Sequence, residues 1–143
     1  MGGIDGALLE GVMTSLGPVL QRAAAHHGER PAVLMDGLVL SYSQLWDAAG
    51  RVTSLLSSLG IVPGDRVAVM LPNVPAFPIA FYGAIGAGAV VVPVNPLLKS
   101  REVAYYLRDS GATVLFAWHT AAGEAGPVRA PGGRRGCRGR YPA

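Results

Sequence analysis

The residues best suited to binding a nucleotide gather in one segment, GAIGAGAVVVPVNP, from Gly83 to Pro96. The spacing Gly83-x-x-Gly86-x-Gly88 is similar to a dinucleotide fingerprint, in which backbone amides at the start of a helix meet the pyrophosphate. Here the glycines close a predicted helix and lead into a predicted strand, so the amide cradle would be in the wrong place. We interpret these glycines, with the neighbouring alanines, as small residues that permit close packing of a helix against a sheet.

The other chemically suggestive residues do not assemble into a site. Lys99-Ser100 is similar to the end of a phosphate-binding loop, but Leu98 stands where that loop requires glycine. His26 and His27 adjoin at a predicted helix end, where they complement the helix dipole, and His119 is solitary. The sequence has no metal-ligand spacing and no G-x-S-x-G nucleophile elbow, and its carboxylates are scattered. We therefore assign no catalytic, cofactor-binding or metal-binding residue.

No charged side chain lies between Arg66 and Lys99, a run long enough to cross a bilayer. Proline recurs through this run, and a single membrane helix across these prolines would leave several backbone groups unpaired. The prolines are Pro72, Pro75, Pro78, Pro93 and Pro96. We expect a buried helix followed by a buried strand, and no membrane span.

The N-terminal elements must position whatever site exists. Hydrophobic spacing predicts a helix from Met13 to His27. Two apolar runs, Ala32–Met35 and Leu38–Tyr42, flank Asp36-Gly37, which is a strong hairpin signal. A second amphipathic helix should begin after Ser43, as its N-cap, and end at Gly60.

From Arg66 onward, strands alternate with helices. We predict strands at 66–71, 89–94 and 113–117, with helices that end near Ala87 and Ser110 between them. Asn73 and Ser100 are the predicted N-caps of these two helices. Such alternation predicts right-handed crossovers and an open α/β arrangement. The predicted fold is therefore the first part of a doubly wound, mostly parallel sheet, preceded by a helix and a β-hairpin.

The 143 residues are enough for one ordinary domain, and their net charge of +3 comes from the C-terminal end. Residues 127–143 hold five arginines and no acid, whereas residues 1–126 hold seven basic and nine acidic side chains. This Gly/Arg/Pro-rich tail is either disordered, an out-of-frame translation of GC-rich DNA, or a basic arm for nucleic acid or anionic lipid. We expect no nucleic-acid partner. A single cysteine, Cys137, and no basic region before Asp5 and Glu10 favour a cytoplasmic location.

Taken in order, several segments resemble the N-terminal part of the adenylate-forming, or AMP-binding, acyl-CoA synthetases. RPAVLMDGLVLSYSQL resembles the family's opening hairpin and its T-Y-x-E-L helix start, with Ser41 in place of Thr and Gln44 in place of Glu. PGDRVAVMLPN is similar to the G-D-R-V-A-x-x-x-x-N strand, and GAVVVPVNP to the G-A-x-x-x-P-x-N-P block. The resemblance covers about residues 13–120, and VPVNP favours the fatty-acyl-CoA ligases within the family.

The resemblance implies an enzyme that converts a carboxylate and Mg-ATP to an acyl-adenylate and passes the acyl group to coenzyme A. The family's phosphate loop, S-G-T-T-G-x-P-K-G, and its catalytic lysine have no counterpart here, and Lys99 is the sole lysine. We therefore expect residues 1–12 to be disordered, residues 13–126 to form a partial N-terminal subdomain, and the chain to be inactive alone without ATP, Mg²⁺ or CoA sites. Two alternatives remain: a non-catalytic module that docks on a companion ligase polypeptide, and a basic-tailed binder of nucleic acid or membrane.

Overall fold

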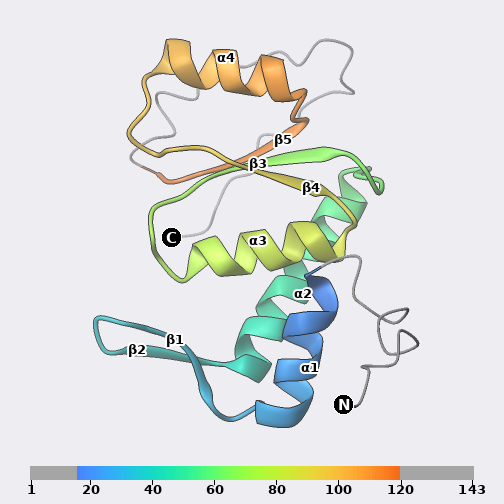
Figure 1. Ribbon diagram of the computed structural model, residues 1–143, viewed down its shortest axis with the longest axis vertical. Helices are drawn as coiled ribbons and strands as arrows, with labels where there is room; N and C mark the ends of the chain where they lie inside the picture. Colours follow the sequence, from blue (N-terminus) through green and yellow to red (C-terminus); the bar gives the residue numbers. More distant parts are fainter. Residues whose placement is uncertain (1–15, 120–143) are drawn as a thin grey trace, which may run out of the picture.

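The computed structural model describes residues 16–119 and arranges them as a helix–hairpin unit followed by a three-stranded sheet (Figure 1). The first unit comprises α1 (Gly17–His27), β1 (Pro31–Met35), β2 (Leu38–Ser41) and α2 (Tyr42–Ser58). The second comprises β3 (Arg66–Met70), α3 (Ala76–Gly86), β4 (Val90–Pro93), α4 (Ser100–Ser110) and β5 (Val114–Ala117). The predicted order of elements is confirmed throughout this range.

The hairpin forms where the sequence predicts it. Strands β1 and β2 pair antiparallel, and both turn residues have positive φ, 47° at Asp36 and 84° at Gly37. Positive φ at both central positions gives a two-residue turn whose twist matches that of the strands. Helix α1 begins at Gly17 among the described residues, while the predicted start at Met13 lies outside them.

The predicted N-cap of α2, Ser43, is wrong, because the chain leaves extended backbone two residues earlier. Ser41 has φ −75° and ψ 166°, and its Oγ accepts a hydrogen bond of 3.2 Å from the Gln44 N–H. In return, the Gln44 Oε1 accepts the Ser41 N–H at 2.9 Å. This reciprocal capping box satisfies two backbone donors of the first turn. Tyr42, predicted as strand, is therefore the first residue of the helix.

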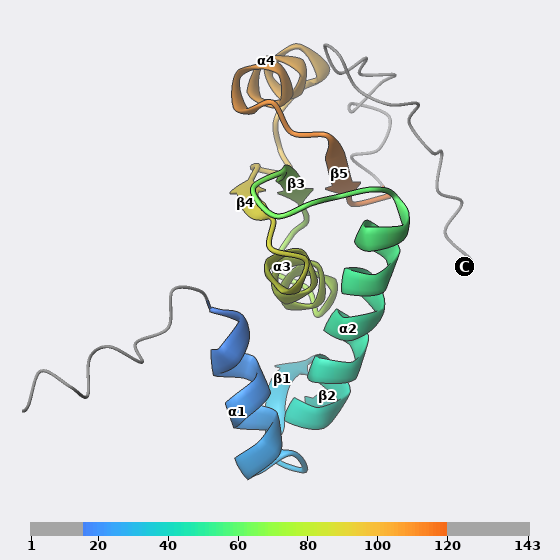
Figure 2. The same cartoon turned by 90° about the vertical axis from the view of Figure 1, so that its right-hand side faces the viewer.

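The sheet has the order β4-β3-β5, with both pairs parallel, and helices cover both of its faces (Figure 2). Val67 and Val69 of β3 pack into one core with residues of α2 and α3, including Leu56. Ala68 and Met70 pack into a second core with residues of α4. These four β3 residues have no exposed surface, as expected for the central strand of a parallel sheet. The doubly wound α/β arrangement is therefore confirmed.

The predicted caps of α3 and α4 are also wrong. Helix α3 starts after Pro75, which already has helical dihedrals and makes no side-chain cap, so Asn73 lies two residues outside the helix end. Helix α4 includes Ser100, and its N-cap is Lys99, which is the last extended residue. The Lys99 N–H donates to Glu102 Oε2 at 3.0 Å, so a carboxylate from within the helix satisfies the backbone donor of the N-cap residue.

The glycines of α3 pack against another helix and not, as predicted, against the sheet. A Cβ at Gly83 would lie 2.5 Å from the Val52 side chain and 2.9 Å from the Ala49 carbonyl oxygen, both on α2. The Thr53 hydroxyl of α2 donates to the Gly83 carbonyl at 2.9 Å. Ala84, on another side of α3, enters the sheet core. The glycine therefore lets two helix backbones approach each other.

None of the helices in the described range is long and apolar enough to cross a bilayer.

Two glycine-to-alanine substitutions should change stability in opposite directions. Gly83→Ala should lower the free energy of unfolding by about 1–3 kcal/mol, because the added methyl overpacks the α2–α3 contact. Gly50→Ala in α2 should raise it by about 0.5–1 kcal/mol, because a Cβ there meets open space and alanine favours a helix. Urea denaturation measures both effects. Equal changes in the two variants would contradict the close helix contact.

Candidate functional site

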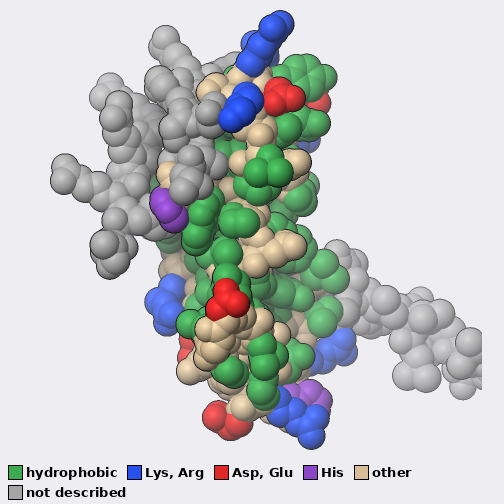
Figure 3. Space-filling view, turned by 90° about the vertical axis from the view of Figure 1, so that its left-hand side faces the viewer, with side chains coloured by type: hydrophobic (Ala, Val, Ile, Leu, Met, Phe, Trp, Pro, Cys, Tyr) green, Lys and Arg blue, Asp and Glu red, His purple; other side chains and the backbone are tan. Residues whose placement is uncertain are grey.

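The carboxyl ends of β3, β4 and β5 lie at one edge of the sheet, on the left-hand side of Figure 1. Successive crossovers pass on opposite faces of the sheet, with α3 on one and α4 on the other, so the chain diverges at this edge. Open α/β sheets bind ligands in the crevice outside such strand ends. Figure 3 looks onto this edge and shows mainly hydrophobic side chains along it, with few charged ones.

Asn73 is the polar residue of this edge that sequence reasoning misassigned. It follows the central strand, is exposed, and its side chain makes no hydrogen bond within residues 16–119. The turn around it is held by backbone atoms instead, with the Val74 N–H donating to the Pro72 carbonyl at 2.8 Å. The Asn73 amide lies at the end of the central strand and holds no other described residue in place, so it is available to bind a ligand.

Asn95, which follows β4, stabilises the turn after this strand. Its Oδ1 accepts the Leu97 N–H at 2.9 Å, and its backbone carbonyl accepts the Leu98 N–H at 3.2 Å. Side-chain to backbone bonds of this kind stabilise turns in the place of a backbone pair. Asn95 therefore shapes the loop between β4 and α4.

The third strand brings two aromatic rings to the edge. The Trp118 N–H donates to the Met70 carbonyl at 3.1 Å, which extends the β3–β5 pairing past Ala117. The rings of Trp118 and His119 lie 4.8 Å apart between centroids at 49°, and His119 is exposed. Trp118 is half-buried against the core under α4, so the imidazole of His119 is the more exposed of the two rings.

Neither helix that starts at this edge offers a phosphate cradle. In α3, Pro75 and Pro78 have no N–H, and the Phe77 N–H already donates to the Val74 carbonyl at 2.9 Å. In α4, the carboxylate of Glu102 already occupies the helix start. Free amides at a helix N-terminus are what binds phosphate. The start of α3 therefore lacks a run of free amides, and the start of α4 already carries a carboxylate, so neither fits a nucleotide phosphate.

The remaining sequence candidates lie away from this edge. Gly83, Gly86 and Gly88 are at the C-terminal end of α3, at the opposite edge of the sheet, where Gly88 turns with φ 74°. His26 and His27 occupy the last turn of α1, as predicted. Within residues 16–119, no group of three or more His, Cys, Asp or Glu side chains is placed to hold a metal ion, and no polar side chain is buried.

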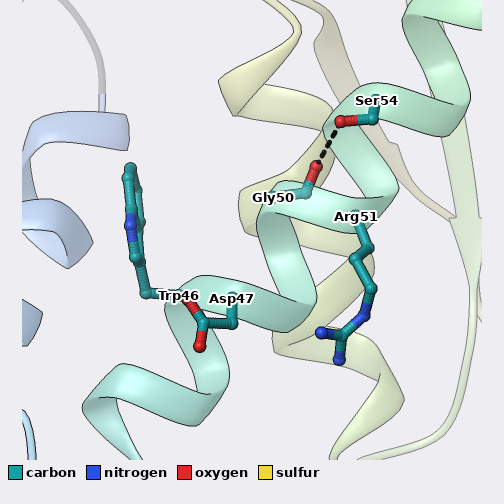
Figure 4. Close-up of a pocket in the computed structure, with 5 residues that line it drawn as sticks. All are labelled: Trp46, Asp47, Gly50, Arg51 and Ser54. Carbon is teal, nitrogen blue, oxygen red and sulfur yellow. Dashed lines mark hydrogen bonds between the residues drawn. The ribbon is translucent and has the colours of Figure 1, made fainter.

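An open hollow lies on α2 (Figure 4). Its lining comes from one helix: Trp46, Asp47, Gly50, Arg51 and Ser54. The hydrogen bond drawn there runs within the helix, from the Ser54 Oγ to the Gly50 carbonyl at 3.0 Å, and Trp46 extends away from Arg51. Polar groups do not converge on the hollow, as they do in binding sites. It is the outer face of a helix.

The architecture defines a class of protein: a parallel, doubly wound α/β unit. In this class, ligands bind beside the carboxyl ends of the strands. The sequence profile of the family described as AMP-binding enzyme matches residues 20–135. The chain belongs to this family. It is 37% identical over 103 residues to the long-chain-fatty-acid–CoA ligase of Salmonella typhimurium, and 41% identical over 91 residues to FadD13, a long-chain-fatty-acid–CoA ligase of Mycobacterium tuberculosis. These alignments cover 71% and 64% of this chain but only 18% of each ligase.

Solved structures agree with the sequence relatives. A fatty acyl CoA synthetase of Mycobacterium tuberculosis matches 82% of the chain with a TM-score of 0.75 and 34% identity. The N-terminal domain of FACL13 from the same organism matches 84% with a TM-score of 0.76 and 33% identity. The match covers 24% of the first structure and 32% of the second. The fold is thus that of part of the N-terminal domain of acyl-CoA ligases.

The two asparagines of this edge should respond differently to truncation. Asn95→Ala should lower the free energy of unfolding by about 0.5–1.5 kcal/mol, because it removes the Oδ1 acceptor of the turn. Asn73→Ala should change it by less than about 0.5 kcal/mol, because its side chain holds nothing in place. Chemical denaturation at a common pH measures both variants. A destabilised Asn73→Ala protein would show that this residue is structural.

Proposed function

We propose that this chain supplies the N-terminal part of an ATP-dependent fatty-acyl-CoA ligase. The family converts a carboxylate to an acyl-adenylate and then transfers the acyl group to coenzyme A. The proposal rests on the similarity to long-chain-fatty-acid–CoA ligases, which extends through the sheet and the helices on both of its faces. The chain's own contribution is a scaffold: a rigid sheet edge that presents Asn73, Trp118 and His119 to a site completed by other residues.

A companion polypeptide that carries the remainder of the ligase is part of this proposal, as is a cytoplasmic location. The helix starts at the sheet edge are closed by prolines and by Glu102, so phosphates would have to be held elsewhere. The 143-residue sequence contains no family phosphate loop, and its one lysine, Lys99, begins a helix. ATP, Mg²⁺ and CoA would therefore bind mainly to the companion, and this chain would hold none of them by itself.

The purified 143-residue chain should neither hydrolyse ATP nor form acyl-adenylate. Adenylyl transfer needs preorganised donors and cations around the developing charge, and loss of one such group commonly costs about 10²–10³ in rate. Pyrophosphate release measured with ATP, Mg²⁺ and a series of fatty acids tests this. Release that depends on the carboxylate, and that persists after further purification, would show that the chain is active alone.

A chimeric ligase tests the proposed function itself. In the Salmonella typhimurium ligase, the segment that aligns with this chain would be replaced by the corresponding residues of this chain. The chimera should form acyl-CoA from a long-chain fatty acid, because the scaffold is shared at 37% identity over 103 residues. The measurement is acyl-CoA formation coupled to AMP release. The matched control is the same chimera carrying Gly83→Ala, which should lose thermal stability while it retains the same substrate preference. A folded but inactive chimera would count against the proposal.

A further inference from the structure

We propose that the outer face of α4 is a self-association surface, which joins two copies of this chain through parallel α4 helices. Such a dimer would be independent of the ligase activity proposed above. Helix α4 covers the face of the sheet opposite to α2 and α3, and it is the outermost of the described elements at that end of the molecule (Figure 2). Its inner face is already used, because Val103 and Leu107 are buried in the core under the helix. The outer face is the one open to a partner.

The exposed side chains of α4 form two stripes of opposite charge. Residues at positions i, i+4 and i+7 lie on one side of a helix, and two sets of α4 residues have this spacing. The basic stripe consists of Arg101, Tyr105 and Arg108, and the acidic stripe of Glu102, Tyr106 and Asp109. All six side chains are exposed. Charges that are separated by sign on the two sides of a helix face select the partner helix and its orientation.

These charges are not used inside the described part of the chain. The side chains of Arg101, Arg108 and Asp109 have no hydrogen-bond or ion-pair partner among residues 16–119. Glu102 uses one carboxylate oxygen to accept the Lys99 N–H. The two stripes therefore keep most of their charge for a partner outside this unit.

Two tyrosines distinguish this face from an ordinary solvated helix face. Tyr105 is 56% exposed and Tyr106 is 46% exposed. Their ring centroids lie 5.8 Å apart, and the rings meet edge to face at 82°. Tyrosine and arginine are the residues most enriched where proteins bind each other, because they combine a large contact area with polar groups. A tyrosine pair between arginines is thus a composition typical of an interface.

A second copy of α4 matches this face when the two helices are parallel. A two-fold axis along the helices places the basic stripe of each copy against the acidic stripe of the other. The stripes are offset by one residue, which is a rise of only about 1.5 Å. Arg101 therefore lies level with Glu102 of the second copy, and Arg108 with Asp109 of the second copy. Antiparallel helices would bring like charges together, so the charge pattern also specifies the orientation.

The size of the face determines the strength of the dimer. Helix α4 has 11 residues, and a helix of this length spans about 16 Å. One such helix covers less than the roughly 800 Å² per partner of a standard interface. Exposed ion pairs each contribute little and are screened by salt. We therefore expect a weak dimer, with a Kd in the micromolar to millimolar range and a clear dependence on salt.

Sedimentation of the 143-residue chain over a concentration series tests the dimer. Arg108→Glu and Asp109→Lys should each weaken self-association by about tenfold or more, because two attractive pairs per dimer become repulsive. An equimolar mixture of the two variants should associate within about twofold of the unmutated chain, since the new carboxylate of one variant faces the new ammonium of the other. Circular dichroism checks that both variants fold.

Asp47→Lys is the matched control for these variants. It makes the same change of charge at an exposed position of α2, on the other side of the sheet, and should leave self-association unchanged. A chain that stays monomeric up to millimolar concentration would overturn the inference. A dimer that neither α4 variant weakens, or a mixture that does not restore association, would overturn it too.

Three further outcomes would assign another contact and so contradict the α4 dimer. A dimer that is lost in Leu34→Asp but kept in Arg108→Glu would place the contact at the hairpin, where Leu34 is 70% exposed. A dimer lost on deletion of residues 127–143 would show that their five arginines, and not a second α4, bind the acidic stripe. A chimeric ligase that stays monomeric where the 143-residue chain dimerises would show that another part of the ligase covers α4.

Discussion

The close contact between α2 and α3 joins the two parts of the structure. Gly83 brings the helix backbones together, and the Thr53 hydroxyl donates across the contact to the Gly83 carbonyl. Each helix then serves the other unit: Leu56 of α2 lies in the sheet core, while Ile79 and Tyr82 of α3 pack against the core beneath α1. A larger side chain at Gly83 would push α2 and α3 apart and so disturb the packing of both cores. The orientation of the sheet relative to the helix–hairpin unit therefore depends on one missing side chain.

The contact between α2 and α3 also affects the edge of the sheet at the carboxyl ends of β3, β4 and β5, where the candidate site lies. It holds α3 against one face of the sheet, and the start of α3 then lies at the strand ends, where Pro75 and Pro78 have no N–H and the Phe77 N–H donates to the Val74 carbonyl. The other helix start is occupied by Glu102. This edge offers an exposed asparagine and two aromatic rings, but its helix starts are not free to bind an anion. It can therefore line a ligand site without supplying the charged groups. The charged groups that adenylyl transfer needs must approach it from another part of a complete ligase.

Most of the fold could be predicted because its signals are local. Asp36-Gly37 selects a tight hairpin turn, and the apolar run after Arg66 reads as a strand buried on both faces. The helix caps could not be predicted in the same way. Ser41, Ser43, Asn73 and Ser100 all have side chains that can cap a helix, and the choice depends on the residue at which the chain leaves extended backbone. That point depends on neighbouring prolines, which act locally, and on strand pairing, which only the folded structure shows. The candidate site escapes sequence reasoning for the same reason, because Asn73 is equally suited to cap a helix.

By itself, the sequence determined the order of the elements, the parallel sheet and the family resemblance, because periodicity, turn residues and motif spacing act within short segments. It also showed that Gly83-x-x-Gly86-x-Gly88 closes a helix and leads into a strand, which argues against a phosphate cradle. Only the tertiary structure decided that Gly83 and Gly86 face α2 and not the sheet. It alone showed that Asn73 lies outside α3 with its side chain exposed. Both outcomes depend on how segments pack in the folded chain, and no short stretch of sequence contains that information.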